Sequence, residues 1–184
     1  YAREITEARR LLDKIGPPLG VDTYLNYMVD DTGEALRLAS YVGISEEMAH
    51  SIERVELGQH ICGAVALQRQ SIVATHIQES DDPKAQLAKS FGLRAYACNP
   101  LMSDKVLLGT LSFASRTRNQ FDPDELAILQ TISHYVAVAY AKLRTQAAVS
   151  ESEKQFRFIL ESIPQKLVTT KPDGGVDYFN PQWM

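Results

Sequence analysis

LRAYACNPLMSDKVLLGTLSFASRTRNQFDPDEL, residues 93–126, is the stretch that decides the fold. It contains two apolar runs, 95–102 and 106–114, and the turn residues Ser-Asp-Lys between them predict a β-hairpin. After a polar loop, Asp122 fits a helix N-cap and Pro123 the first helical position. A hairpin that leads into a long helix is typical of sensor modules, and the stretch has no obvious nucleophile, general base or phosphate-binding loop.

A continuous helical pattern follows from Asp122 to about Ile163, where Pro164 ends it. Helices longer than about 25 residues are uncommon inside one globular domain and are typical of coiled coils or of rods between domains. Apolar residues recur along it at threes and fours, close to a heptad spacing. We expect this signalling helix to pair with a second copy through Leu129, Val136, Leu143 and Ala147. The alternative is that these residues all face a sheet.

The flanking residues alternate between strand and helix patterns. Strands are predicted at 23–29, 35–42 and 71–77, short helices at 45–53 and 84–91, an amphipathic helix at 2–15 and a final hairpin at 166–179. Residues 57–67 contain two glycines and have no clear pattern beyond a short helix at their end.

The composition is that of a globular protein with an acidic balance. The chain has 184 residues, 45% of them hydrophobic, and a formal net charge of -4. The acidic balance argues against a nucleic-acid-binding surface, and no apolar run reaches the roughly 18 residues of a membrane span. Cys62 and Cys98 stand among apolar and small residues, so we expect both to be buried, reduced and inert in a cytoplasmic protein.

Four blocks of the central region together resemble the GAF domain, a small α/β sensor module of signalling proteins. They are TYLNYMVDDTGEALRLASYVG (23–43), GQHICGAVALQRQSIVATHIQ (58–78), FGLRAYACNPLM (91–102) and LLGTLSFASRTRNQFDPDELAILQTISHYVAVAY (107–140). The chain is most similar to GAF domains that stand beside PAS domains in bacterial sensor histidine kinases and related two-component proteins.

Residues 152–184 resemble the first third of a PAS domain, with an entry helix, a hairpin around Asp173 and Gly174, and Asn180 at the family's Asn position. The expected organisation is an N-terminal linker or dimer helix at 1–19, a GAF domain at 20–144, a connecting signalling helix at 145–163 and the incomplete start of a PAS domain at 164–184.

The GAF resemblance implies an α+β fold around a roughly six-stranded, mostly antiparallel sheet. Helices from the two ends of the domain would pack on one face, with short helices and loops on the other, and a long helix would end the domain. A small ligand, when present, is expected between the sheet and residues 53–93. Its polar contacts would come from Tyr27, Tyr41, His60, Thr75, His76, Tyr96 and Asn99. The alternative is that most of these are ordinary strand residues with a buried ring and a polar tip.

Other chemistry of histidine and cysteine fits the sequence poorly. No helical histidine has the acidic neighbour and nearby proline of a kinase phospho-acceptor. A zinc site from His60, Cys62, His76 and Cys98 is disfavoured because only the His-x-Cys pair is close in sequence. We therefore predict no metal and no cofactor. Redox sensing by Cys62 stays open, although no basic residue or helix start is clearly placed to lower its thiol pKa.

Two ligand classes of the family also fit poorly. Bilin attaches to a Cys, usually followed by His, in the helix before Phe91, and residues 84–90 contain neither. Phe121, Asp124 and Glu125 match the end of the cyclic-nucleotide motif, but its Asn and Lys have no counterpart here. These three residues also suit a structural interpretation, in which the ring fills the core and the acids cap the helix.

We expect a non-catalytic, cytoplasmic sensory GAF module of a bacterial two-component protein, which is not itself an enzyme. It would form a homodimer through its terminal helices and relay a ligand or conformational state to an adjacent PAS domain and an output domain. The resemblance suggests a histidine kinase as output, and the charge and the apolar runs of the sequence predict no nucleic acid or membrane as partner. Alternatives are a redox-sensing or cyclic-nucleotide-binding GAF domain, and a ligand-free dimerisation scaffold. Arg116 and Arg118 are expected in a solvated loop or facing an anion.

Overall fold

The computed structural model describes Lys14 and residues 16–183. The helix predicted at 2–15 therefore lies, except for Lys14, outside the described residues. The chain divides into two compact units, Tyr1–Tyr140 and Ala141–Met184, which are taken separately below. None of the described helices is both long and apolar enough to cross a membrane.

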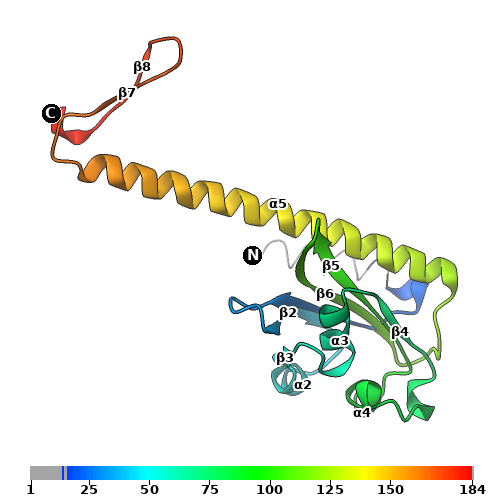
Figure 1. The fold of residues 1–184 in the computed structure, drawn as a ribbon. Helices are drawn as coiled ribbons and strands as arrows, with labels where there is room; N and C mark the ends of the chain where they lie inside the picture. Colours follow the sequence, from blue (N-terminus) through cyan, green and yellow to red (C-terminus); the bar gives the residue numbers. More distant parts are fainter. Residues whose placement is uncertain (1–13, 15, 184) are drawn as a thin grey trace. The chain divides into compact units, whose positions relative to one another are not determined.

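A six-stranded sheet forms the centre of the first unit (Figure 1). Its strands, in order across the sheet, are β3 (Arg54–Glu56), β2 (Ala35–Val42), β1 (Thr23–Val29), β6 (Val106–Ser115), β5 (Ala95–Ser103) and β4 (Ile72–Ala74). Every neighbouring pair is antiparallel. The expected α+β class and the six-stranded sheet are confirmed. Strand β3 was not predicted, and the strand predicted at 71–77 is shorter because the chain turns after Ala74.

The β5–β6 hairpin confirms the prediction from residues 93–126. Asp104 forms its turn with a φ of 52°, in the left-handed region that aspartate tolerates better than most residues. Because side chains alternate along a strand, Tyr96 and Cys98 face one side of the sheet, while Ala97 and Asn99 face the other. The first pair belongs to the main apolar core.

Short helices cover the side of the sheet that carries Tyr96 and Cys98 (Figure 1). They are α2 (Glu46–Ser51), α3 (His60–Gln68), α4 (Gln86–Ser90) and the 3-10 turns η2 (Ile77–Glu79) and η3 (Pro83–Ala85). Ser45 caps α2 by accepting a hydrogen bond from the backbone N–H of Met48. A Cβ on Gly63 would lie 2.2 Å from the backbone oxygen of Glu56, so the lack of a side chain there lets α3 approach the end of β3.

The long helix α5 (Pro123–Ser162) has 40 residues, as the sequence predicts. Its first half belongs to the sheet-containing unit and lies on the opposite face from α3 (Figure 1). Leu129, Ser133 and Ala137 are its buried residues, one turn apart, and Asn26 of β1 donates a hydrogen bond to the hydroxyl of Tyr140. The expected role of Leu129 in a dimer contact is therefore wrong, because this side chain is buried within its own unit.

The second unit contains the remainder of α5, the hairpin β7 (Val168–Thr170) and β8 (Val176–Phe179), and the turn η4 (Pro181–Trp183). Asn180 is buried, and its side chain links the end of the helix to the hairpin. Its amide donates to the backbone oxygens of Leu160, Ile163 and Gln165, and its oxygen accepts from the N–H of Leu167. One side chain thus satisfies backbone groups that the end of a helix leaves open.

Candidate functional site

A small cavity lies between the sheet and the helices α3 and α4. Its lining is mostly apolar, with polar atoms from Tyr27, His60, Cys62, Lys84 and Tyr96. The cavity has a volume of about 30 Å³, enough for one or two water molecules. Pockets for larger small molecules are typically about 300–1,000 Å³. A metabolite therefore fits only if α3 or α4 moves away from the sheet.

Three of the seven expected ligand contacts, Tyr27, His60 and Tyr96, line this cavity, and Tyr41, Thr75, His76 and Asn99 do not. Strand β4 ends at Ala74, so the next two residues belong to an exposed turn, in which His76 has a φ of 50°. Asn99 faces α5 because it stands an odd number of residues from Tyr96 on the same strand. The sequence did not predict the apolar lining from α3, α4 and Ile52, which follows α2, because it depends on how these elements are placed in three dimensions.

Cys62 lies in the first turn of α3, over the sheet. Its Sγ is 3.0 Å from the Tyr96 hydroxyl and 3.5 Å from the Ser112 hydroxyl. Ser112 of β6 is directly opposite Cys98, which stands two residues after Tyr96 on β5, so these three side chains share one face of the sheet. We call these four buried residues, Cys62, Tyr96, Cys98 and Ser112, the thiol cluster. The expectation that both cysteines are buried is confirmed.

The thiol cluster lowers the pKa of Cys62 to about 7. The largest cause is a hydrogen bond with the Cys98 side chain, and the hydroxyls of Ser112 and Tyr96 act in the same direction against desolvation. Burial raises the pKa of Cys98 and of Tyr96, so both keep their protons. The expectation that no helix start serves Cys62 is wrong, because it is the third residue of α3, where free backbone N–H groups favour an anion.

Two further titratable side chains face the same cavity. Burial lowers the pKa of His60, which favours a neutral imidazole at pH 7. Burial also raises the pKa of Tyr27, whose hydroxyl donates a hydrogen bond to the backbone oxygen of Ile52. His60 has a φ of 53°, an uncommon backbone conformation for a residue other than glycine.

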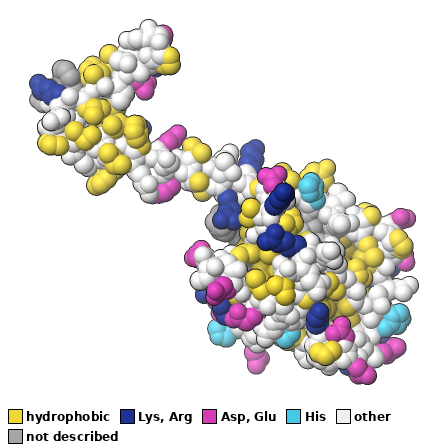
Figure 2. All heavy atoms as spheres, in the orientation of Figure 1, with side chains coloured by type: hydrophobic (Ala, Val, Ile, Leu, Met, Phe, Trp, Pro, Cys, Tyr) yellow, Lys and Arg dark blue, Asp and Glu magenta, His cyan; other side chains and the backbone are white. Residues whose placement is uncertain are grey.

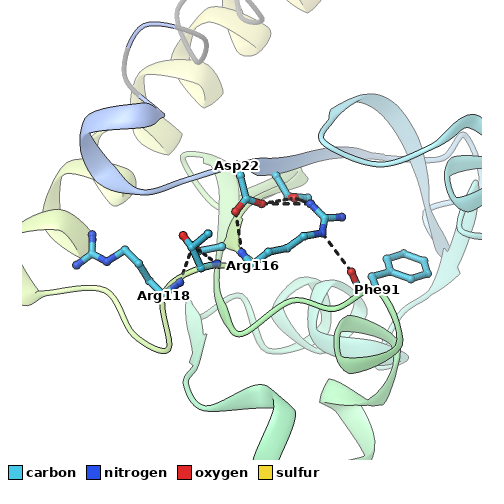
Figure 3. A network of polar contacts seen from close by, with 7 residues as sticks. Asp22, Phe91, Arg116 and Arg118 are labelled. Carbon is cyan, nitrogen blue, oxygen red and sulfur yellow. Dashed lines mark hydrogen bonds and ion pairs between the residues drawn. The ribbon is translucent and has the colours of Figure 1, made fainter.

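Arg116, just after β6, connects the cavity wall to the start of β1 (Figure 3). Its Nε donates to the backbone oxygen of Phe91, a cavity-lining residue at the end of α4, at 3.3 Å. Its Nη1 donates to Asp22 at 3.2 Å and to the hydroxyl of Thr23 at 2.6 Å, and its backbone N–H donates to Asp22 at 2.7 Å. The side chain is thus engaged within the domain, which corrects the expectation of a solvated loop.

Arg118 connects the same loop to the start of α5. Its Nη1 donates to Glu125 at 2.6 Å and to the backbone oxygen of Leu19 at 3.1 Å. Glu125 also accepts from the backbone N–H of Asp122, one half of a capping box. The hydrogen bond from Arg118 is the largest cause that lowers the pKa of Glu125. Phe121 is buried, so this segment has the structural role that was the alternative to cyclic-nucleotide binding.

The opposite face of the sheet carries a larger and more open groove of about 440 Å³ between α5 and β5. Its polar lining residues are Arg69, Gln70, Ser71, Asn99, Gln130, Ser133 and His134. Ser71 donates to Asn99 at 2.8 Å, so part of this polar lining is already paired. Across Lys14 and residues 16–183, no group of three or more His, Cys, Asp or Glu side chains is arranged to hold a metal ion.

Comparison with known proteins places this geometry in context. Residues 4–140 match the family described as GAF domain. A curated relative, the methyl sulfide methyltransferase-associated sensor of Methanosarcina acetivorans, is 23% identical over 124 residues, which are 66% of this chain. The chain spans only 12% of that relative's length.

Three solved structures of similar fold come from different kinds of protein. A GAF region of a putative membrane protein from Geobacter sulfurreducens has a TM-score of 0.64 and 22% identity, over 74% of this chain and 92% of that one. A domain of a putative two-component sensor histidine kinase from Sinorhizobium meliloti has a TM-score of 0.61 and 17% identity, over 77% of this chain and 94% of that one. The free methionine-R-sulfoxide reductase of Neisseria meningitidis has a TM-score of 0.64 and 20% identity, over 77% of this chain and 80% of that one. These likenesses concern the fold alone.

Proposed function

This chain belongs to the GAF domain family, and from that premise we propose that it is a non-catalytic sensory module of a two-component signalling protein. It binds a small molecule between the sheet and the helices α3 and α4, and passes the bound state to α5. A homodimer formed through α5 carries the change to a PAS domain that begins at 164–184, and then to a histidine kinase output. The sensor from M. acetivorans and the kinase domain from S. meliloti support a sensory role.

The observation that carries this proposal is the link between the cavity wall and the start of α5. Phe91 ends the α4 side of the cavity, and its backbone oxygen is held by Arg116. Two residues further on, Arg118 holds Glu125 in the first turn of α5. Because the cavity has room for only one or two water molecules, a ligand has to displace α3 or α4, and we propose that it displaces α4 and so disturbs the Phe91–Arg116 contact. That disturbance reaches α5 through one short loop.

The outer surface of α5 supports pairing with a second copy. Ile128, Tyr135 and Val138 are 45%, 70% and 52% exposed, and they recur at seven and three residues along the helix. We call these three residues the exposed stripe. Its spacing is that of a two-helix contact, and it replaces the contact at Leu129 that the sequence suggested. In the second unit, Phe156, Phe158 and Ile159 are also exposed. Figure 2 shows hydrophobic side chains gathered on the surface of this unit, and such a surface is suited to a partner.

A cavity-filling substitution tests the relay without a known ligand. Ala88 lines the cavity on α4 and is buried, so Ala88→Leu adds more volume than about 30 Å³ can hold and pushes α4 outwards. We expect amide hydrogen exchange in residues 123–130 to become at least about threefold faster. The same substitution in an Arg116→Gln background adds no further change at 123–130, because the link is already broken.

Ser90→Leu is the matched control, since it adds a larger side chain at an exposed position of the same helix. It should leave exchange at 123–130 unchanged. If Ala88→Leu accelerates exchange in α4 alone, the cavity does not communicate with α5 and the proposed relay is wrong.

A further inference from the structure

The thiol cluster has properties that a binding cavity alone does not need. A sulfur atom forms part of the cavity wall and two hydroxyl groups contact it. Ser112, one of these two contacts, is directly opposite Cys98 on the neighbouring strand, which brings a second buried thiol to the same face of the sheet. Both cysteines are free in this structure. Apolar residues of the same size would fill this space without the cost of burying polar groups.

From this geometry we propose that Cys62 and Cys98 form a reversible disulfide when a small hydroperoxide, such as hydrogen peroxide, enters the cavity. The site is thus a modification site on the face of the sheet covered by α3. It is independent of the proposed relay, because the chemistry needs only the folded domain and an oxidant.

The reaction balances in two steps. The Cys62 thiolate attacks one peroxide oxygen, the O–O bond breaks, and an S–O bond forms to give a sulfenic acid; the leaving oxygen takes up the proton lost from the thiol and departs as water or an alcohol. The Cys98 sulfur then attacks the Cys62 sulfur, the S–O bond breaks, and the Cys98 proton leaves with the hydroxide as water. The two thiols lose two electrons in total, and the peroxide gains them.

The surroundings assign different roles to the two sulfurs. Cys62 faces the cavity and its pKa of about 7 makes it the thiol that ionises first. The Tyr96 hydroxyl, 3.0 Å away, keeps its proton and so donates to the thiolate. Burial raises the pKa of Cys98, so this thiol suits the second step, in which it attacks an already oxidised partner.

The other charged or titratable groups at the cavity do not replace Cys62 as the group that ionises and attacks the peroxide. Tyr27 on β1 faces Cys62, and burial raises its pKa, so it stays neutral. His60 on α3 is half-buried, and burial lowers its pKa, so it also favours the neutral form at pH 7. Lys84 on η3 also lines the cavity, but its side chain is exposed and it is not among the groups that lower the pKa of Cys62. The thiolate therefore depends mainly on the thiol cluster itself.

The size of the cavity selects the oxidant. A volume of about 30 Å³ admits a molecule with two oxygen atoms but not a branched alkyl hydroperoxide. Disulfide formation shortens the contact between the sulfurs to about 2.05 Å, which draws α3 towards β5. Oxidation thus alters the same cavity wall that the proposed ligand must displace.

The test exposes the reduced 184-residue chain to hydrogen peroxide and maps the products by non-reducing peptide mass spectrometry. We expect a disulfide between Cys62 and Cys98 within one chain, reversed by a dithiol reductant. Cys98→Ser should stop at a sulfenic acid on Cys62, which dimedone traps when it is added together with denaturant, and Cys62→Ser should leave Cys98 unmodified. Two free thiols after treatment, or disulfides only between chains, would overturn the proposal.

Two further measurements separate this chemistry from oxidation of an unfolded chain. Hydrogen peroxide should react at least about tenfold faster than tert-butyl hydroperoxide, and equal rates would show that the sulfur reacts only after the cavity opens to solvent. The thiolate absorbance at 240 nm should titrate near pH 7 and move upwards in Tyr96→Phe, with far-UV circular dichroism as the check on folding. A midpoint near 9 in the unmodified chain contradicts the assignment of Cys62, whatever the outcome of the hydrogen-exchange test of the relay.

Discussion

The two faces of the six-stranded sheet are packed in different ways. The face under α3 is closed over an apolar core, a cavity of about 30 Å³ and the thiol cluster. The face under α5 carries buried polar residues such as Asn26 and Asn99, and an open groove of about 440 Å³. Along its 40 residues, α5 buries only Leu129, Ser133 and Ala137.

This difference in packing suggests that the two faces of the sheet have different functions. A closely packed apolar face holds the groups of the thiol cluster in defined positions, and a ligand enters it only by displacing a packed helix, since interiors of this density resist rearrangement. A helix that fully buries one large apolar side chain, and is otherwise held by half-buried residues and a few hydrogen bonds, can shift at lower cost. The α3 face is therefore suited to detection, and the α5 face to movement.

The largest expected effect concerns the main anchor of α5. Leu129 is 1% exposed, and Leu129→Ala should lower the free energy of unfolding of the sheet-containing unit by about 2–5 kcal/mol. Gln130→Ala, the adjacent exposed position, should change it by less than about 0.5 kcal/mol. Urea denaturation followed by circular dichroism measures both. Equal effects would show that α5 is not anchored through this side chain, and would remove the contrast between the two faces.

A glycine tests the opposite face. Gly63→Ala places a Cβ that would lie 2.2 Å from the backbone oxygen of Glu56, so α3 must move and unfolding should become easier by about 1–3 kcal/mol. The shift should also weaken the contacts of Cys62 and raise its thiol pKa from about 7 towards the usual value. Absorbance at 240 nm follows the titration, and Gln68→Ala at the exposed end of α3 is the control. A destabilised variant with an unchanged pKa would mean that the thiol cluster does not depend on the position of α3.

Local signals in the sequence predicted much of this architecture. The hairpin and the start of α5 depend on turn residues and on a Pro-containing helix start, which act within a few residues. Strand β3 has only three residues and pairs at the sheet edge with β2, so it shows no periodic pattern of its own. Short strands of this kind are defined by their neighbours.

The site was harder to predict because it combines residues from separate elements. Alternation on β5 is enough to place Tyr96 and Cys98 on one face, but only the packing of α3 brings Cys62 to them. Helix periodicity likewise detected the apolar face of α5 without showing what it contacts. Leu129 was therefore expected to contact a second helix, with the sheet as the alternative, and its burial decides for the sheet.

The exposed stripe on α5 gives a third, smaller test. Tyr135→Glu puts a charge at its centre, where the side chain is 70% exposed. If a second copy pairs there, dimer dissociation should become at least about tenfold easier, equivalent to about 1.4 kcal/mol. Gln130→Glu adds the same charge beside the groove and should have little effect. Sedimentation velocity over a range of concentrations distinguishes these outcomes. Dissociation by Gln130→Glu alone would place the partner in the groove, and a monomer at all concentrations would contradict the homodimer.

The smallest expected effect is on the melting temperature, depends on pH and concerns Glu125 in the first turn of α5. Hydrogen bonds from Arg118 and from the backbone of Asp122 lower the pKa of Glu125 below 4.5 in the folded chain. Its ionised form therefore adds stability above pH 4.5, and this stability is lost as the pH falls through the lower folded-state pKa. Glu125→Gln should lower the melting temperature by roughly 1–3 °C at pH 7.

The difference between Glu125→Gln and the unmodified chain should stay constant from about pH 8 to pH 5 and shrink below 4.5. Calorimetry at pH 7, 5, 4 and 3 measures it, with Asp124→Asn, an exposed acid in the same helical turn, as control. Asp124 shares the favourable position in the first turn but not the hydrogen bond to Arg118, so its effect isolates the contribution of the helix dipole. If both variants behave alike, the loop arginine does not hold α5, and the cavity and the helix are coupled by some other contact.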